Sequence, residues 1–329
     1  MLPLLLACAQ AKLSVDGADT GKDDPILGDS ADTADSADTG ETDELVYDCA
    51  ALPQLGDIED NELVGPRAYH DVIFDDAGNL LGTDGSSILK STYAGAVTPF
   101  VPGLGTVQGM AHLPDGDIVA ADDTQAALLR IGADGAVSTI ATGLSGAYGV
   151  TVGPDGMVYV GNIYNGGRVE MVRVDPTTGE SATWLTMRAG ESPRMVVFSV
   201  DNTVGYIATV GRMRVYAVDL DADLNVVGDA RVYADNVGAG WQDGIGLDAC
   251  GNLYVPDYSS SSMYRITPDG TVEDLMRHRA GIYGHGLEWG SGIGGWRTDA
   301  IYLPQPYDGL TVRELVIGVP SADTLRTGP

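Results

Sequence analysis

Residues 243–257 read DGIGLDACGNLYVPD, and this stretch contains the pattern that determines the fold. A short apolar segment follows Asp243, a turn occupies residues 248–252, and a second apolar segment begins at Leu253. Aspartate, glycine and asparagine supply the backbone angles that tight hairpins need. The stretch therefore predicts two antiparallel strands joined by a hairpin.

The same unit occurs six times. Its first strands start at His70, Gln108, Tyr148, Arg194, Asp243 and His285, which are 38, 40, 46, 49 and 42 residues apart. Four-stranded units at this period are typical of a β-propeller. We predict an all-β, six-bladed propeller of four-stranded antiparallel blades that occupies residues 45–329. Either a segment near residues 46–47 or the C-terminal strand at 311–317 completes the ring.

The N-terminal sixth of the chain has a different composition. Its opening, MLPLLLAC, matches a bacterial lipobox with Cys8 as the acylated residue; the alternative is an apolar end in which Cys8 is incidental. Residues 9–44 are acidic and of low complexity. We predict a lipoprotein signal segment at 1–8, with a true start upstream, and a disordered tether at 9–44. The expected location is the outer membrane, cell surface or periplasm of a bacterium, with the lipid as the only membrane contact.

The other two cysteines, Cys49 and Cys250, form an even pair in an exported chain. Disulfides form and persist in oxidising compartments. Cys49 begins the folded part, and Cys250 lies in the turn at 248–252. We therefore predict a disulfide that clamps the N-terminal arm onto that turn.

Charge and hydropathy exclude several classes of protein. The chain has 47 acidic and 18 basic residues, a formal net charge of −29, so nucleic acid is not an expected partner. No apolar run approaches about 20 residues, which excludes a polytopic membrane protein. Residues 1–60 hold 15 of the acids and two lysines, so much of the charge belongs to the predicted tether. We expect a monomer.

Candidate functional residues follow from the fold. The residue before each innermost strand of a propeller points into the mouth of the central channel, and here these are His70, Gln108, Tyr148, Arg194, Asp243 and His285. Channel mouths are wet, so polarity alone does not make a site. His70, Asp243 and His285 would suit Zn²⁺ or general acid–base catalysis, with histidine poised near neutral pH. Arg194, Tyr148 and Gln108 would bind substrate. His112 and His278 are predicted to be structural or exposed.

Residues 243–248 followed by 251–255 resemble the SMP-30/gluconolactonase/LRE-like family of six-bladed propellers and, more distantly, NHL-type propellers. The resemblance implies a lactonase with a divalent cation, such as calcium, held by a glutamate, two asparagines and an aspartate. Asp243 matches the aspartate, but His70, Tyr148 and Arg194 stand at the other positions. An arginine repels a cation, which argues against the same metal site.

Two functions remain open from the sequence. The first is hydrolysis of a lactone or ester at the channel mouth, with a divalent ion (calcium or zinc) as cofactor. The second is a non-catalytic propeller that binds a glycan or protein at its rim. Trp289 and Trp296, joined by Trp241 and Tyr258, would offer a stacking surface there, and the alternative is that they pack between blades. The fold does not decide between them, because propellers host many chemistries.

Overall fold

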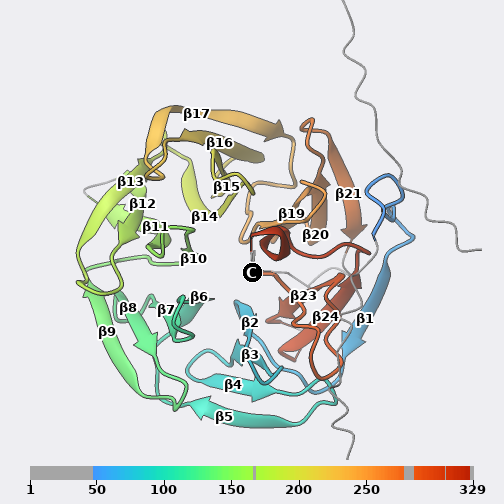
Figure 1. The fold of residues 1–329 in the computed structure, drawn as a ribbon, viewed down its shortest axis with the longest axis horizontal. Helices are drawn as coiled ribbons and strands as arrows, with labels where there is room; N and C mark the ends of the chain where they lie inside the picture. The colour runs from blue at the N-terminus through green and yellow to red at the C-terminus, as the bar shows by residue number, and fades with distance from the viewer. Residues whose placement is uncertain (1–46, 166–167, 278–284, 308, 327–329) are drawn as a thin grey trace, which may run out of the picture. The chain divides into compact units, whose positions relative to one another are not determined.

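The computed structural model describes residues 47–165, 168–277, 285–307 and 309–326. Six four-stranded antiparallel sheets surround a central axis (Figure 1). The predicted six-bladed propeller is therefore confirmed. The predicted signal segment with Cys8, the acidic tether and His278 lie outside the described residues.

Blades 1 to 3 follow one another along the chain, and their strands run in order from the axis outward. Blade 1 contains β2 (Val72–Phe74), β3 (Leu80–Thr83), β4 (Ile88–Ser91) and β5 (Val97–Val101). Blade 2 contains β6 (Val107–His112), β7 (Ile118–Asp122), β8 (Ala127–Ile131) and β9 (Val137–Thr142). Blade 3 contains β10 (Val150–Val152), β11 (Val158–Asn165), β12 (Arg168–Val174) and β13 (Ser181–Thr186).

Blades 4 and 5 repeat this order, whereas blade 6 takes its outermost strand from the N-terminal side. Blade 4 contains β14 (Ser192–Phe198), β15 (Val204–Val210), β16 (Arg214–Leu220) and β17 (Val226–Asp235). Blade 5 contains β18 (Gly246–Leu247), β19 (Leu253–Asp257), β20 (Ser262–Ile266) and β21 (Val272–Arg277). Blade 6 contains β22 (Glu288–Trp289), β23 (Ala300–Gln305), β24 (Thr311–Val316) and β1 (Glu59–Leu63).

The hairpin turns form where the sequence pattern predicts them. In blade 2, Gly116 has φ +88°, and its amide donates to the Leu113 carbonyl at 2.9 Å. A residue with a Cβ rarely adopts this backbone conformation, so glycine at the end of Pro-Asp-Gly permits the tight turn. All five residues of β7 are buried, whereas the outermost strand β9 exposes its first three.

The hydrophobic core lies between neighbouring blades. One cluster joins Ile73 and Leu81 of blade 1 to Met110 and Leu129 of blade 2, all of them buried. Because each blade packs both faces against its neighbours, the inner strands carry apolar residues on both faces. Polar side chains at the ends of the inner strands, such as Asp243 before β18 and Glu288 at the start of β22, lie at the openings of the channel.

Blade 6 closes the ring with both ends of the folded domain. Strand β1 pairs antiparallel with β24, from Glu59 opposite Val316 to Leu63 opposite Val312. The C-terminal strand predicted at 311–317 is thus the third strand of the blade. The alternative prediction, a closing segment near residues 46–47, is wrong in position: the N-terminal contribution begins at Glu59, after an arm that first contacts blade 5.

That arm is fixed by the predicted disulfide. Cys49 is bonded to Cys250, with a Cα–Cα distance of 5.5 Å and a sequence separation of 201 residues. Nearby, Nη1 of Arg265 donates to the Pro53 carbonyl at 2.9 Å. The pairing of Cys49 with Cys250 is confirmed, and it attaches the N-terminal arm to the first turn of blade 5.

The C-terminal segment crosses one end of the channel (Figure 1). Its 3₁₀ helix η1 (Ala322–Leu325) begins at Ser321, whose hydroxyl accepts from the Asp323 amide. Upstream, the Ala249 amide of blade 5 donates to the Pro320 carbonyl at 2.9 Å. Downstream, Arg326 donates to Asn202 Oδ1 of blade 4 at 3.0 Å.

In the described ranges, no helix is long and apolar enough to cross a bilayer.

Candidate functional site

The opposite end of the channel carries the predicted mouth residues. Five of them, from blades 1, 3, 4, 5 and 6, are buried and in contact with one another: His70, Tyr148, Arg194, Asp243 and His285. The sixth, Gln108 of blade 2, is partly buried, and its Oε1 accepts no hydrogen bond from the described residues. We call the five residues the mouth cluster.

His285 lies at the centre of the mouth cluster. Its Nδ1 is 2.9 Å from the Tyr148 hydroxyl, 3.0 Å from Oδ2 of Asp243 and 3.4 Å from Nδ1 of His70. One ring nitrogen carries at most one proton, so an N–H at this position serves only one of these neighbours at a time. The 3.4 Å contact between the two histidines shows that closure of the ring brings blades 1 and 6 together at the mouth, as the blade order predicts.

Asp243 is the most enclosed member, with 2 % of its surface exposed. Its Oδ1 lies 3.4 Å from Nε of Arg194. Despite these close approaches, neither carboxylate oxygen forms a well-directed hydrogen bond with the described residues. Buried polar groups in folded proteins are nearly always hydrogen-bonded. The Asp243 side chain has no exposed surface in this structure, so a ligand or a reacting water reaches it only when a neighbouring side chain of the mouth cluster moves.

Arg194 is held in place by stacking and by the close approach of two blades. Its guanidinium carbon lies 3.7 Å from the ring centre of Tyr148 and 5.7 Å from that of Trp241. A Cβ on Gly149 or Gly161 of blade 3 would come within 2.3 Å or 2.0 Å of the Arg194 carbonyl oxygen. These glycines let blade 4 approach closely enough for the guanidinium to lie flat on the tyrosine ring.

The electrostatic environment changes one expectation. Burial, reinforced by His285 and Arg194, lowers the pKa of His70 from 6.5 to about 3. The prediction of a histidine poised near neutral pH is therefore wrong for His70, which is uncharged at pH 7 because the protonated ring would be buried beside Arg194. Burial and the Asp243 carboxylate raise the pKa of Tyr148 well above its usual value, so its hydroxyl stays protonated.

The donor set does not fit the predicted divalent ion at His70, Asp243 and His285. Within the described ranges, no group of three or more His, Cys, Asp or Glu side chains has the arrangement of a metal site. The Arg194 guanidinium, 3.4 Å from Asp243, also places a fixed positive charge where a cation would need the carboxylate. We therefore derive no chemical step through a metal.

Four aromatic side chains surround the mouth cluster. Tyr258 lies with its ring centre 5.9 Å from Trp241, 6.1 Å from Tyr307 and 5.3 Å from His285, and Tyr69 lies 4.1 Å from His70. Trp241 and Tyr307 are 42 % and 53 % exposed. Tyr69 and Tyr307 were not predicted from the sequence, although Tyr69 immediately precedes a mouth residue. We call these four residues the aromatic rim.

A third residue that was not predicted from the sequence is Asp71, which directly follows His70. Its two oxygens accept from the amides of Val72 at 3.0 Å and Met110 at 2.8 Å, so it links blade 1 to blade 2. Burial raises the pKa of Asp71 to about 7. The signal for it was an acidic residue inside an apolar strand start.

Asp257, at the end of β19, shapes the part of the rim that carries Trp241. Its Oδ2 accepts from the amides of Gly240 and Trp241 at 3.1 and 2.8 Å, and its Oδ1 accepts from the amides of Ala239 and Ser260 at 3.1 and 2.7 Å. A single carboxylate thus anchors the loops on both sides of β19.

We expect Asp257→Asn to lower the free energy of unfolding by about 1–3 kcal/mol, because an amide nitrogen cannot accept from two of these four donors. Trp241 should become more mobile at the same time. Chemical denaturation and tryptophan fluorescence anisotropy measure the two effects. Asp229→Asn, which makes the same change on an exposed part of β17, is the control. Equal stability of the two variants would contradict the assignment.

Comparisons with known proteins identify the family of the chain. A family model described as SMP-30/Gluconolactonase/LRE-like region matches residues 90–278, more than half of the chain. No curated protein matches it in sequence. Among solved structures, a gluconolactonase from Xanthomonas campestris matches with a TM-score of 0.65 and 15% identity, over 81% of this chain and 91% of that one.

Two other solved structures share the fold but differ in their described roles. Regucalcin from Agrobacterium tumefaciens, a calcium-binding protein, has a TM-score of 0.61 and 20% identity over 77% of this chain and 91% of that one. An auxiliary nutrient binding protein from Bacteroides thetaiotaomicron has a TM-score of 0.62 and 13% identity over 78% and 76%. At these identities the structures show the fold alone. The family match and the six-bladed architecture together establish that this chain belongs to the SMP-30/gluconolactonase/LRE-like family.

Proposed function

We propose that the chain hydrolyses a lactone or ester at the channel mouth. The observation that carries this proposal is the buried Asp243 carboxylate, which lies between Arg194 and His285 and has no well-directed hydrogen bond among the described residues. A carboxylate in this state is a candidate general base, and a stacked arginine beside it is a candidate stabiliser of a developing oxyanion. Membership of a family that includes gluconolactonases supports the reaction class.

The proposed reaction needs only side chains of the mouth cluster. Asp243 takes a proton from water, and the water oxygen bonds to the carbonyl carbon of the substrate. Arg194 stabilises the negative charge that forms on the carbonyl oxygen. The bond from the carbonyl carbon to the alkoxy oxygen then breaks, and that oxygen takes the proton back from Asp243. Tyr148 and the neutral His70 orient the reactants by hydrogen bonding.

The test is a hydrolysis panel of lactones of different ring size and simple esters, followed by a pH indicator, with the protein before and after treatment with a chelator. We expect turnover of at least one lactone or ester, and equal rates before and after chelation, because Arg194 supplies the positive charge. Absence of turnover with and without added calcium or zinc would overturn the hydrolase proposal. Turnover that requires the added ion would overturn the metal-independent form.

The pH profile gives a second prediction. Because the pKa of His70 is about 3 in the folded protein, its protonation should not affect kcat/KM between pH 5 and 8. Profiles of the wild type and of His70→Gln should therefore have the same shape in this range. An inflection near pH 6.5 in the wild type that disappears in the variant would contradict the assignment.

A non-catalytic role is the second candidate, and the aromatic rim favours it. Exposed Trp241 and Tyr307 offer the flat apolar faces on which sugar rings stack. The fold neighbours include a nutrient binding protein. Saturable binding of a glycan, weakened by Trp241→Ala and without turnover of any lactone or ester, would select this reading.

We further propose that the chain is an exported lipoprotein anchored through Cys8. The disulfide between Cys49 and Cys250 supports export, because such bonds persist in oxidising compartments. Metabolic labelling with a fatty acid, lost in Cys8→Ala, tests the anchor. An unlabelled chain recovered from the cytoplasm would contradict it.

A further inference from the structure

The end of the channel opposite the mouth cluster contains a cavity of about 360 Å³. Its walls come from the far ends of the inner strands, and the C-terminal segment contributes Ser321, Asp323 and Arg326. Cavities of this size are at the lower end of the range that holds small organic ligands. The hydrolysis proposed at the mouth makes no use of this space.

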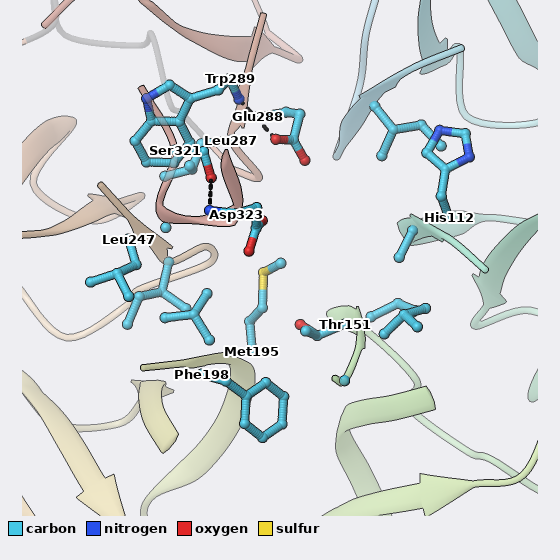
Figure 2. Close-up of a pocket in the computed structure, with 18 of the residues that line it drawn as sticks. His112, Thr151, Met195, Phe198, Leu247, Leu287, Glu288, Trp289, Ser321 and Asp323 are labelled. Carbon is cyan, nitrogen blue, oxygen red and sulfur yellow. Dashed lines mark hydrogen bonds between the residues drawn. The ribbon is translucent and has the colours of Figure 1, made fainter. Parts of the chain in front are cut away.

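The lining combines an apolar surface with acidic groups. Met110, Val150, Met195, Ile245 and Leu287 contribute apolar walls. Figure 2 shows the carboxyl groups of Glu288 and Asp323 facing the same space, with Met195 and Thr151 on the other side. An apolar pocket with one or two placed charged groups is the common form of a site that orients a small ligand.

Glu288 is the acidic group with the fewest compensating partners. Its Oε1 accepts from the amide of the next residue, Trp289, at 2.9 Å. Burial, with Asp323 and Asp71 nearby, raises the pKa of Glu288 to about 8. The environment therefore disfavours a negative charge on Glu288 unless a positive charge enters the cavity.

The basic groups of the lining are already engaged. Arg326, the only arginine or lysine among the lining residues, is paired with Asp323 at 3.2 Å and donates to Asn202 and to the Phe198 carbonyl. His112 lies with Nε2 2.7 Å from the Phe74 carbonyl. An adjoining hollow of about 370 Å³ shares His112 and Glu288 and adds two further carboxylates, Asp75 and Asp76.

We propose that this cavity is a second ligand site, separate from the mouth, for a small organic amine whose ammonium group pairs with Glu288 and whose apolar body packs against the methionines and branched side chains. The net negative charge of the domain also favours a cationic ligand, since residues 61–329 hold 32 acidic and 16 basic residues. Charge pairing in a partly desolvated pocket strengthens the contact relative to water.

The test is calorimetric titration at pH 7 with three probes of similar shape: benzylamine, benzyl alcohol and benzoate. We expect benzylamine to bind at millimolar concentration or below, at least tenfold more tightly than benzyl alcohol, and benzoate not to bind. Because Glu288 is mostly protonated at pH 7, its ionisation on binding should release close to one proton per amine. Titrations in phosphate and in Tris separate this release from the heat of binding.

Two variants and two controls locate the site. Glu288→Gln keeps the acceptor for the Trp289 amide and should lose the preference for benzylamine and the proton release. Asp323→Asn should weaken the amine only a few-fold, since Arg326 already offsets that charge. Asp229→Asn and Asp223→Asn remove the same charge from exposed positions, and both variants should bind as the wild type does.

Several results would overturn the proposal: no binding of benzylamine at millimolar concentration, equal affinity for the alcohol and the amine, or an unchanged preference in Glu288→Gln. Equal weakening in Glu288→Gln and Asp229→Asn would show a general attraction of cations and would also overturn it. The assay measures binding in the cavity opposite the mouth cluster, so its failure is distinguishable from absence of hydrolysis at the mouth.

Discussion

Replacing Asp243 with asparagine is expected to reduce kcat for lactone or ester hydrolysis by about 10²–10³-fold. Asparagine keeps the size of the side chain and one oxygen, but it cannot accept a proton from water. KM should change much less than kcat, because Asp243 is 2 % exposed and acts on the attacking water rather than on the body of the substrate. Steady-state kinetics on the best substrate of the panel measure both values.

The control separates chemistry from folding. Asp243→Asn leaves the Arg194 guanidinium without its carboxylate partner, so thermal unfolding and near-UV circular dichroism should be compared with the wild type. A second variant, Arg194→Lys, keeps the positive charge but loses the flat stack on Tyr148 and should also lower kcat. A folded Asp243→Asn protein with activity within tenfold of the wild type would refute the assignment of the base.

Removing the disulfide is expected to lower the free energy of unfolding by about 2–5 kcal/mol, the largest change in stability that we predict. The bond closes a loop with a sequence separation of 201 residues, so it strongly restricts the unfolded chain. In the folded protein it holds the arm that leads to β1, the strand that completes blade 6. Denaturant titration of the Cys49→Ser, Cys250→Ser double variant measures the loss.

Reduction of the wild type provides the matched control, because it breaks the same bond without changing the sequence. Reduced wild type and the double variant should unfold at the same denaturant concentration, and a reductant should not affect the double variant. Unchanged stability of the double variant would mean that β1 stays paired without the bridge.

The fold could be predicted from the sequence because its determinants are local and repeated. The Pro-Asp-Gly turns at 114–116, 154–156 and 268–270 require the same backbone conformation, and six matching strand starts make the ring unambiguous. The position of β1 could not be predicted in this way. Residues 59–63, EDNEL, lack the apolar alternation of a strand, and they pair only because β24 offers them an open edge.

The site could be predicted only in part. The predicted starts of the inner strands lie within three residues of the observed ones, which was enough to assign His70 and His285 to one opening before the structure was known. The low pKa of His70 could not, since it arises from burial beside Arg194 and His285. The cavity opposite the mouth cluster was not predicted either, because Glu288 looks in the sequence like an ordinary strand residue. Its raised pKa depends on burial and on Asp323 and Asp71, which the fold brings near it.

The position of the disulfide has a mechanical consequence for a chain held from its N-terminal side. Cys49 precedes β1, and its bridge leads to the turn of blade 5. A pulling force applied before residue 49 therefore passes through a covalent bond into Cys250 and does not load the hydrogen bonds between β1 and β24. With the bridge intact, the seam of the ring is shielded from tension. Once the bridge is reduced, the same force would act directly on the hydrogen bonds between β1 and β24.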